Sequence, residues 1–215
     1  MTRTALLLSG VGRYADPWHP FAPTSEVIAA VAESRGFAVT IADDVDAAVA
    51  ALEHGALPEL LIANLGKPVD GMPSPAAPAG LERALAEVPL LAVHAAANSF
   101  PDSDAWAAAV GARWIDGVSW HPDYGPVRVS ATAAGRGLGL ADFDTVDERY
   151  HALRPAAERS VLLEVDAEGG GTEPVAWLVE GAPRRAYSAL GHDAAAYDAE
   201  PVRELVGRLV EWVTA

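Results

Sequence analysis

The N-terminal half of the chain alternates short apolar runs with helical segments, and this order restricts the fold more than any other feature. Four short apolar runs are predicted strands: Ala5–Leu8, Phe37–Ile41, Leu60–Ala63 and Leu90–Val93. The first of them lacks the polar alternation of a half-exposed strand, so it is expected to be buried on both faces. Helices are predicted between them, and 68–78, rich in Pro and Gly, is a predicted loop. A βαβαβαβ order predicts a parallel sheet with helices on both faces.

The predicted helices of this half begin at Thr24 or Ser25, as N-cap residues, and then at Val45 and Leu81. The C-terminal half is less regular. Its predicted elements are the helix Ala105–Val110, the strands Val127–Ser130, Val161–Val165, Val175–Val179 and Arg185–Leu190, and the amphipathic helix Glu200–Val213. Glu168–Gly171 predicts a hairpin turn. We therefore expect one α/β domain over residues 1–215, with a mostly parallel central sheet and partly antiparallel C-terminal strands.

The composition excludes several classes of function. A net charge of −15 argues against nucleic acid or an anionic membrane as the partner. The chain has no cysteine, which removes disulfides, thiolate metal sites and a cysteine nucleophile. The apolar run near the N-terminus is too short for a signal-peptide core or a membrane span. We expect a soluble cytoplasmic protein.

Histidines follow three of the predicted strands. His94 directly follows Leu90–Val93, His192 follows Gly191 after the last strand, and His19 lies in the loop after the first strand. Ligands of open α/β sheets bind outside the carboxyl ends of the strands. Each histidine is therefore either a base, an acid or a ligand in that crevice, or a structural side chain bonded to the backbone.

Two adjacent carboxylates, Asp147 and Glu148, precede Arg149 and Tyr150. Neighbouring side chains on a strand point to opposite faces, so only one of the pair is expected to face the crevice. The alternative for this segment is a solvated acidic turn. Several histidines and one carboxylate from different strand ends also describe a divalent metal site, although no local ligand spacing is present.

Five segments, taken together and in order, resemble the ThuA-like (trehalose-utilisation) family. They are Trp18-His19-Pro20-Phe21, Leu90–His94 with Asn98, Gly139–Phe143, Val146–Tyr150, and Pro174–Trp177 with Arg184–His192. The resemblance implies a three-layer flavodoxin-like sandwich akin to class I glutamine amidotransferases. Those enzymes carry a cysteine where this chain has His94, so glutaminase chemistry is excluded.

The same resemblance implies an activity in carbohydrate metabolism, on a sugar or a keto-sugar, by His/Glu acid–base chemistry. The residues expected to be catalytic are His94, Glu148 and His192, and those expected to bind substrate are His19, Asn98, His121 and Tyr150. No cofactor is predicted, with a divalent metal as the alternative. A small-molecule carbohydrate is the expected partner, and a homo-oligomer is left open.

Two other functions remain open on the same fold: a non-catalytic sugar-binding or regulatory protein, and a metal-dependent hydrolase. The chain also departs from the family pattern twice. Residues 131–136 stand where the family has His-Pro-Ile, and Gly181-Ala182-Pro183-Arg184 has a proline in place of the second glycine of Gly-x-Gly-Arg.

Overall fold

A computed structural model describes residues 2–68 and 77–215. Within these residues nine strands form one sheet, in the order β2-β1-β3-β4-β11-β10-β9-β6-β7. The first five strands of that order are parallel: β2 (Phe37–Ala42), β1 (Arg3–Ser9), β3 (Leu60–Asn64), β4 (Leu90–Val93) and β11 (Arg185–Ser188). The other four continue the sheet in antiparallel pairs: β10 (Thr172–Val179), β9 (Arg159–Asp166), β6 (Gly125–Ala131) and β7 (Phe143–Asp147).

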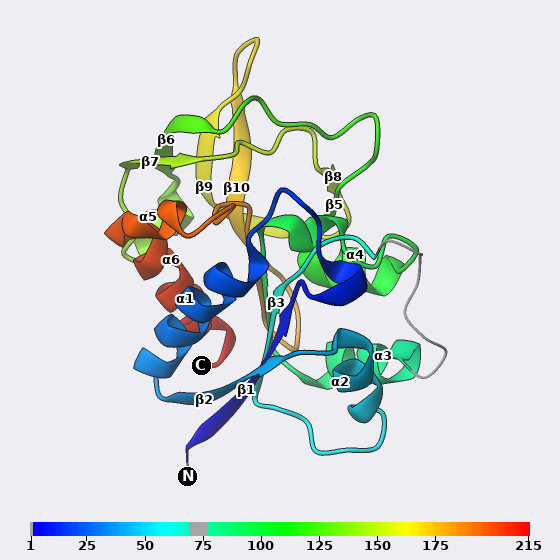
Figure 1. Ribbon diagram of the computed structural model, residues 1–215. Helices are drawn as coiled ribbons and strands as arrows, with labels where there is room; N and C mark the ends of the chain where they lie inside the picture. Colours follow the sequence, from blue (N-terminus) through cyan, green and yellow to red (C-terminus); the bar gives the residue numbers. More distant parts are fainter. Residues whose placement is uncertain (1, 69–76) are drawn as a thin grey trace.

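Helices cover both faces of the parallel part (Figure 1). One face carries α1 (Phe21–Ser34) and α6 (Glu200–Val213), and the other carries α2 (Val45–Ala51), α3 (Ala77–Glu87) and α4 (Asp104–Val110). The remaining elements are short: η1 (Gly12–Tyr14), η2 (His94–Asn98), β5 (Ala112–Arg113), α5 (Ala133–Gly137), β8 (Arg154–Pro155) and η3 (Ala195–Asp198). The predicted three-layer α/β sandwich with a mixed C-terminal half is confirmed.

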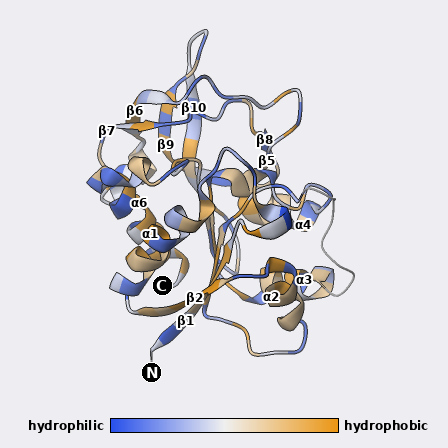
Figure 2. Cartoon of the chain, in the orientation of Figure 1, coloured by the Kyte–Doolittle hydropathy of each residue, from blue (hydrophilic) through white to orange (hydrophobic). Residues whose placement is uncertain are grey.

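The core lies between the sheet and the two helix layers. All of β3 and β4 is buried, and Trp106 and Trp177 are fully enclosed with their indole N–H groups bonded to the carbonyls of Ala96 and Val110. Figure 2 shows hydrophobic colours along the central strands and hydrophilic colours on the outer side of α6. Burial of continuous apolar runs is what parallel strands covered on both faces require.

The start of α1 differs from the prediction. The helix begins at Phe21, so Thr24 and Ser25 lie inside its first turns and are not N-caps. Both side chains are buried and bind Asn64 Nδ2, at 2.8 Å from Thr24 Oγ1 and 3.0 Å from Ser25 Oγ, and Ser25 Oγ also donates to Ser9 Oγ. The two hydroxyls that were predicted to cap the helix therefore bind side chains at the ends of β1 and β3 instead.

Two other predicted boundaries need correction, and one strand was missed. The last strand ends at Ser188, because the Ser188 hydroxyl binds the Leu190 N–H and turns the backbone there. Most of the loop predicted over 68–78 falls on residues 69–76, which lie outside the described residues, and Pro78 belongs to α3. Strand β7 was not predicted at all.

No helix among the described residues is long and apolar enough to span a bilayer.

Candidate active site at the carboxyl ends of the strands

The sheet topology brings the predicted site residues to one edge. Strands β1, β3, β4 and β11 are parallel, so their carboxyl ends share that edge. From β11 to β7 the sheet reverses direction at each of four antiparallel steps. Strand β7 therefore runs in the same direction as β11, and Glu148, which follows β7, emerges at the same edge as His94 and His192.

His94 occupies a sharp turn between β4 and η2. Its φ of 48° is in the left-handed region, where a residue with a side chain is strained unless its surroundings hold it. Tyr187 Oη donates to the His94 carbonyl at 2.7 Å, and His94 Nδ1 donates to the Ala189 carbonyl at 2.6 Å. Burial lowers the pKa of His94 to about 4, so the ring is neutral and Nε2 is unprotonated.

His19 is held by Asp16. One Asp16 oxygen accepts the backbone N–H groups of Trp18 (2.9 Å) and His19 (2.8 Å), and the carboxylate also accepts His19 Nδ1 at 2.8–2.9 Å. Although burial opposes ionisation, these bonds from His19 lower the pKa of Asp16. His19 Nε2 is buried and has no hydrogen-bond partner among the described residues.

The carboxylates of Asp147 and Glu148 have different partners: Asp147 binds backbone groups, and Glu148 faces the histidines. Asp147 is buried and accepts the backbone N–H groups of Gly191 (2.7 Å), Glu148 (2.8 Å) and His192 (3.2 Å), so it fastens the end of β7 to the turn after β11. Burial raises the pKa of Asp147 to about 7, although the three backbone bonds lower it. Glu148 instead points into the site.

Glu148 Oε2 lies 3.3 Å from both His94 Nε2 and His192 Nδ1. Burial opposes ionisation of Glu148, but the two imidazoles lower its pKa far below the usual range. Burial alone would lower the pKa of His192, but its contact with Glu148 raises that pKa by more, so the net change is a rise. The carboxylate is therefore ionised and is a weak base.

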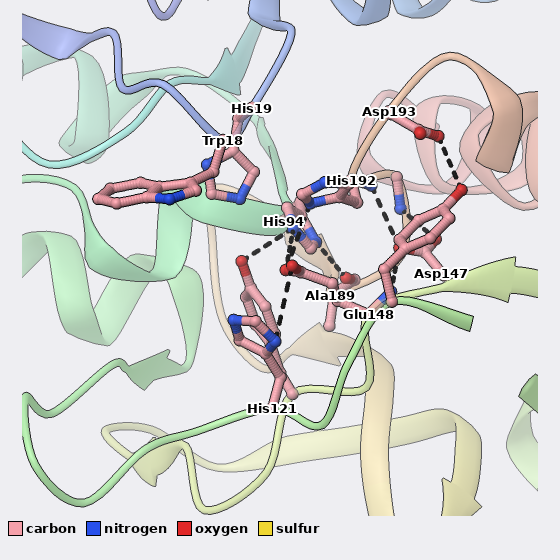
Figure 3. A network of polar contacts seen from close by, with 12 residues as sticks. Trp18, His19, His94, His121, Asp147, Glu148, Ala189, His192 and Asp193 are labelled. Atoms are coloured by element: carbon pink, nitrogen blue, oxygen red, sulfur yellow. Dashed lines mark hydrogen bonds and ion pairs between the residues drawn. The ribbon is translucent and has the colours of Figure 1, made fainter.

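Three imidazoles and one carboxylate meet at a single point (Figure 3). The ring centroids of His19, His94 and His192 lie 4.9–5.4 Å apart, in edge-to-face pairs. One ligand-type atom from each ring and one Glu148 oxygen lie within 4.8 Å of one another. The residues that could hold a metal ion are therefore His19, His94, Glu148 and His192.

A cavity of about 680 Å³ opens beside this cluster, which is the size of a small-molecule site. His19 and Glu148 reach its floor, and the other predicted substrate-binding residues, Asn98, His121 and Tyr150, line it too. Trp18 stands at the rim with 71% of its surface exposed. Neither His94, which is 1% exposed, nor His192 is among the lining residues.

Within the cavity, His121 and Tyr150 lie beside the cluster. His121 Nδ1 is 3.5 Å from Glu148 Oε1 and donates to the Pro122 carbonyl at 3.0 Å, which leaves Nε2 unprotonated in the neutral ring. Tyr150 Oη lies 2.9 Å from His94 Nε2, and burial raises the pKa of the phenol well above its usual range. Both groups can form a hydrogen bond with a bound ligand.

Several polar residues near the motifs lie outside the cluster. The Asp193 carboxylate accepts the backbone N–H of Ala196 in η3 (2.9 Å) and the hydroxyl of Tyr124 (3.0 Å). His151 stacks on Trp120. Sequence reasoning missed Asp16, although an aspartate three residues before a histidine is a local signal for a side chain that holds both the turn and the ring.

The departure from the family pattern at residues 131–136 lies away from the site. Gly125 pairs with Asp147 at the site end of β6, whereas Ala131 is at the other end of the same strand. Six residues of strand span about 20 Å at roughly 3.3 Å per residue. The altered segment begins α5 there and contributes nothing to the cavity lining.

Comparison with known proteins shows which family this chain belongs to. The model of the ThuA family, described as trehalose utilisation, matches residues 16–213. The chain belongs to the ThuA family. This match includes the loop of His19, both halves of the sheet and the segments that carry Glu148 and His192. No curated protein matches this chain.

Solved structures agree in fold. A ThuA-like protein from Parabacteroides merdae superposes with a TM-score of 0.79 at 18% identity, covering 100% of this chain and 91% of that chain. One from Bacteroides uniformis gives 0.74 at 16% identity, covering 99% and 91%. A β-galactosidase from Rahnella sp. R3 gives 0.56 at 13% identity, covering 98% of this chain and 30% of that chain. At these identities the likeness supports the fold alone.

Proposed function

We propose that this ThuA-family protein is an enzyme of carbohydrate metabolism that transfers protons to and from a sugar or keto-sugar bound in the 680 Å³ cavity. The observation that carries the proposal is that one cavity combines an exposed aromatic side chain, Trp18, with titratable side chains, among them His121 and Glu148. An exposed indole offers an apolar face to a sugar ring. The amide of Asn98 can bind hydroxyls.

Proton transfer is assigned to the groups that line the cavity. His121 offers an unprotonated Nε2 as the base that takes a proton from a carbon beside the keto group or from a hydroxyl. Tyr150 is placed to donate a proton to the oxygen that gains charge. His94 and His192, expected from the sequence as acid and base, lie behind Glu148 and act as positioning residues.

The test is hydrogen–deuterium exchange at sugar carbons, followed by NMR in D₂O. This readout detects proton abstraction without knowledge of the net reaction. Glucose, trehalose and their 3-keto forms are incubated with the wild-type protein and with His121→Gln. We expect exchange or product formation with at least one keto form, and a loss of 10²-fold or more in the variant, the scale of general base catalysis.

Two further variants separate binding from chemistry. Trp18→Ala should weaken sugar binding roughly threefold to tenfold, since an aromatic contact contributes ~0.5–1.5 kcal/mol. His54→Ala is the matched control, because His54 is exposed, pairs with Glu53 and does not line the cavity. Saturable sugar binding without exchange or turnover would favour a sugar-binding or regulatory protein, and no binding at all would refute the proposal.

A further inference from the structure

Three buried polar atoms converge without a hydrogen-bond partner among the described residues. They are His19 Nε2, Glu148 Oε2 and His192 Nδ1. Glu148 Oε2 and His192 Nδ1 form an ion pair at 3.3 Å, whereas His19 Nε2 has neither a hydrogen bond nor an ion pair among the described residues. A buried polar group without a partner costs about 1–3 kcal/mol, so His19 Nε2 is expected to bind a ligand. The three atoms are all of the kind that bind a metal ion.

The hydrogen bonds around the cluster prepare two of the rings for coordination. His19 gives its Nδ1 proton to Asp16, and His94 gives its Nδ1 proton to the Ala189 carbonyl. With Nδ1 of each ring engaged in this way, Nε2 is the ring nitrogen left to bind an ion, and it faces the cluster. Metal-binding histidines characteristically donate their second N–H to a carboxylate or a backbone carbonyl in this way.

The distances between the side-chain atoms of the cluster are those expected for ligands of one metal ion. Glu148 Oε2 lies 3.3 Å from His94 Nε2 and from His192 Nδ1, and His192 Nδ1 and Glu148 Oε2 have no hydrogen bond despite this proximity. Nitrogen and oxygen ligands at 2.0–2.1 Å from a tetrahedral zinc ion lie about 3.3–3.4 Å from one another. These two separations match edges of a coordination tetrahedron, and all four ligand-type atoms lie within 4.8 Å of one another.

Tyr150 is the hydrogen-bond partner that competes with an ion for His94 Nε2. Its hydroxyl lies 2.9 Å from His94 Nε2 and can donate to it when no ion is bound. A hydroxyl proton rotates freely about the C–O bond, so an ion at Nε2 would require only that Tyr150 turn its proton to another acceptor.

We propose that His19, His94, Glu148 and His192 bind one divalent transition-metal ion, most suitably Zn²⁺, at the floor of the cavity. Imidazole nitrogens suit zinc and its neighbours among the transition metals, while a single carboxylate leaves the bound ion a net positive charge. His19 and Glu148 border the cavity, so a water or a sugar oxygen can reach the ion from that side as a fifth ligand. The chemical role of the ion, polarising a sugar oxygen, rests on the proposed function, whereas its binding does not.

The test measures metal binding without any sugar. Protein without a histidine tag is stripped with a chelator, incubated with Zn²⁺, Co²⁺ or Mn²⁺, desalted and analysed for bound metal. We expect one Zn²⁺ or Co²⁺ per chain, an increase in Tm on binding, and the visible absorption of four-coordinate Co²⁺. His19→Ala and Glu148→Gln should lose the ion, while His54→Ala should keep it.

Asp16→Asn is the sharpest variant because it preserves the shape of the side chain. It should weaken Zn²⁺ binding 10- to 100-fold, the usual effect of losing a carboxylate behind a histidine ligand. Circular dichroism checks that each variant is folded. Absence of bound metal with all three ions, or full retention of metal by both His19→Ala and Glu148→Gln, would overturn the proposal.

The two proposals fail separately. If no ion binds but deuterium exchange continues in chelator-treated protein, the metal site is refuted and the proposed function stands. If one ion binds through these four residues but no sugar binds or reacts, the metal site stands and the carbohydrate substrate is refuted.

Discussion

At the scale of single residues, the site depends on backbone positions as much as on side chains. His94 presents its ring from a strained turn, and His192 follows Gly191, whose φ is 116°. A Cβ at Gly191 would lie 2.3 Å from Tyr197 Oη. Gly191 therefore serves two purposes: it permits the turn after β11, and it leaves room for the buried Tyr197.

Gly191→Ala should destabilise the protein by roughly 2–4 kcal/mol, from backbone strain of about 1–3 kcal/mol with a steric clash added. Gly181→Ala is a matched control, because Gly181 has the same φ of 116° and nothing within 4 Å of its added Cβ. Urea denaturation of both variants measures the difference. Equal losses would show that the contact with Tyr197 contributes nothing.

At the scale of elements, the end of strand β7, an edge strand of the sheet, is hydrogen-bonded to the turn after β11. Its last residue, Asp147, binds three backbone N–H groups, two of them in the turn that carries His192. This contact links segments that are separated by 44 residues in the sequence. Glu148 and His192 therefore face each other because β7 is fastened to the end of β11.

Asp147→Asn should cost roughly 1–3 kcal/mol, because the amide removes an acceptor and places a donor against backbone N–H groups. Asp144→Asn, on the exposed side of the same strand, should stay within about 0.5 kcal/mol. Thermal or urea unfolding gives both values. A loss at Asp144 as large as that at Asp147 would contradict a specific role for the buried carboxylate.

At the scale of the whole molecule, charge decides which ligands approach the cavity. The chain carries a net charge of −15, and Lys67, the lysine in the cavity lining, is paired with Asp116 at 2.6 Å. The short N-terminal turn after β1 is the three-residue η1 and not a helix, so it offers no anion site of the kind found at helix N-termini.

A neutral sugar should therefore bind more tightly than its phosphate ester. Calorimetric titration of glucose, trehalose and the matching phosphates tests this, at low salt and at physiological salt, where charges are screened beyond about 8 Å. Repulsion of the phosphate should weaken as salt rises. Tighter binding of a phosphate than of its parent sugar would refute this prediction.

The sequence by itself determined the layered fold, because buried parallel strands require uninterrupted apolar runs and those runs are local. It also placed His94 and His192 at strand ends, where glycine and small residues mark the turns. It did not reveal β7, whose residues alternate between buried and exposed in a short acidic segment, and it misplaced the start of α1. Local patterns could not show that the Asn64 side chain would hydrogen-bond to Thr24 and Ser25.

Only the tertiary structure decided which polar residues share one point. His19, His94, Glu148 and His192 come from four segments, and their meeting depends on strand order and direction, which no local pattern encodes. The same holds for the lone pairs, since the tautomers of His19 and His94 follow from Asp16 and from the Ala189 carbonyl, 95 residues away from His94 in the chain. Residue types could suggest acid–base chemistry or a metal; the packing of the strand ends turned four ligand-type atoms toward a single centre.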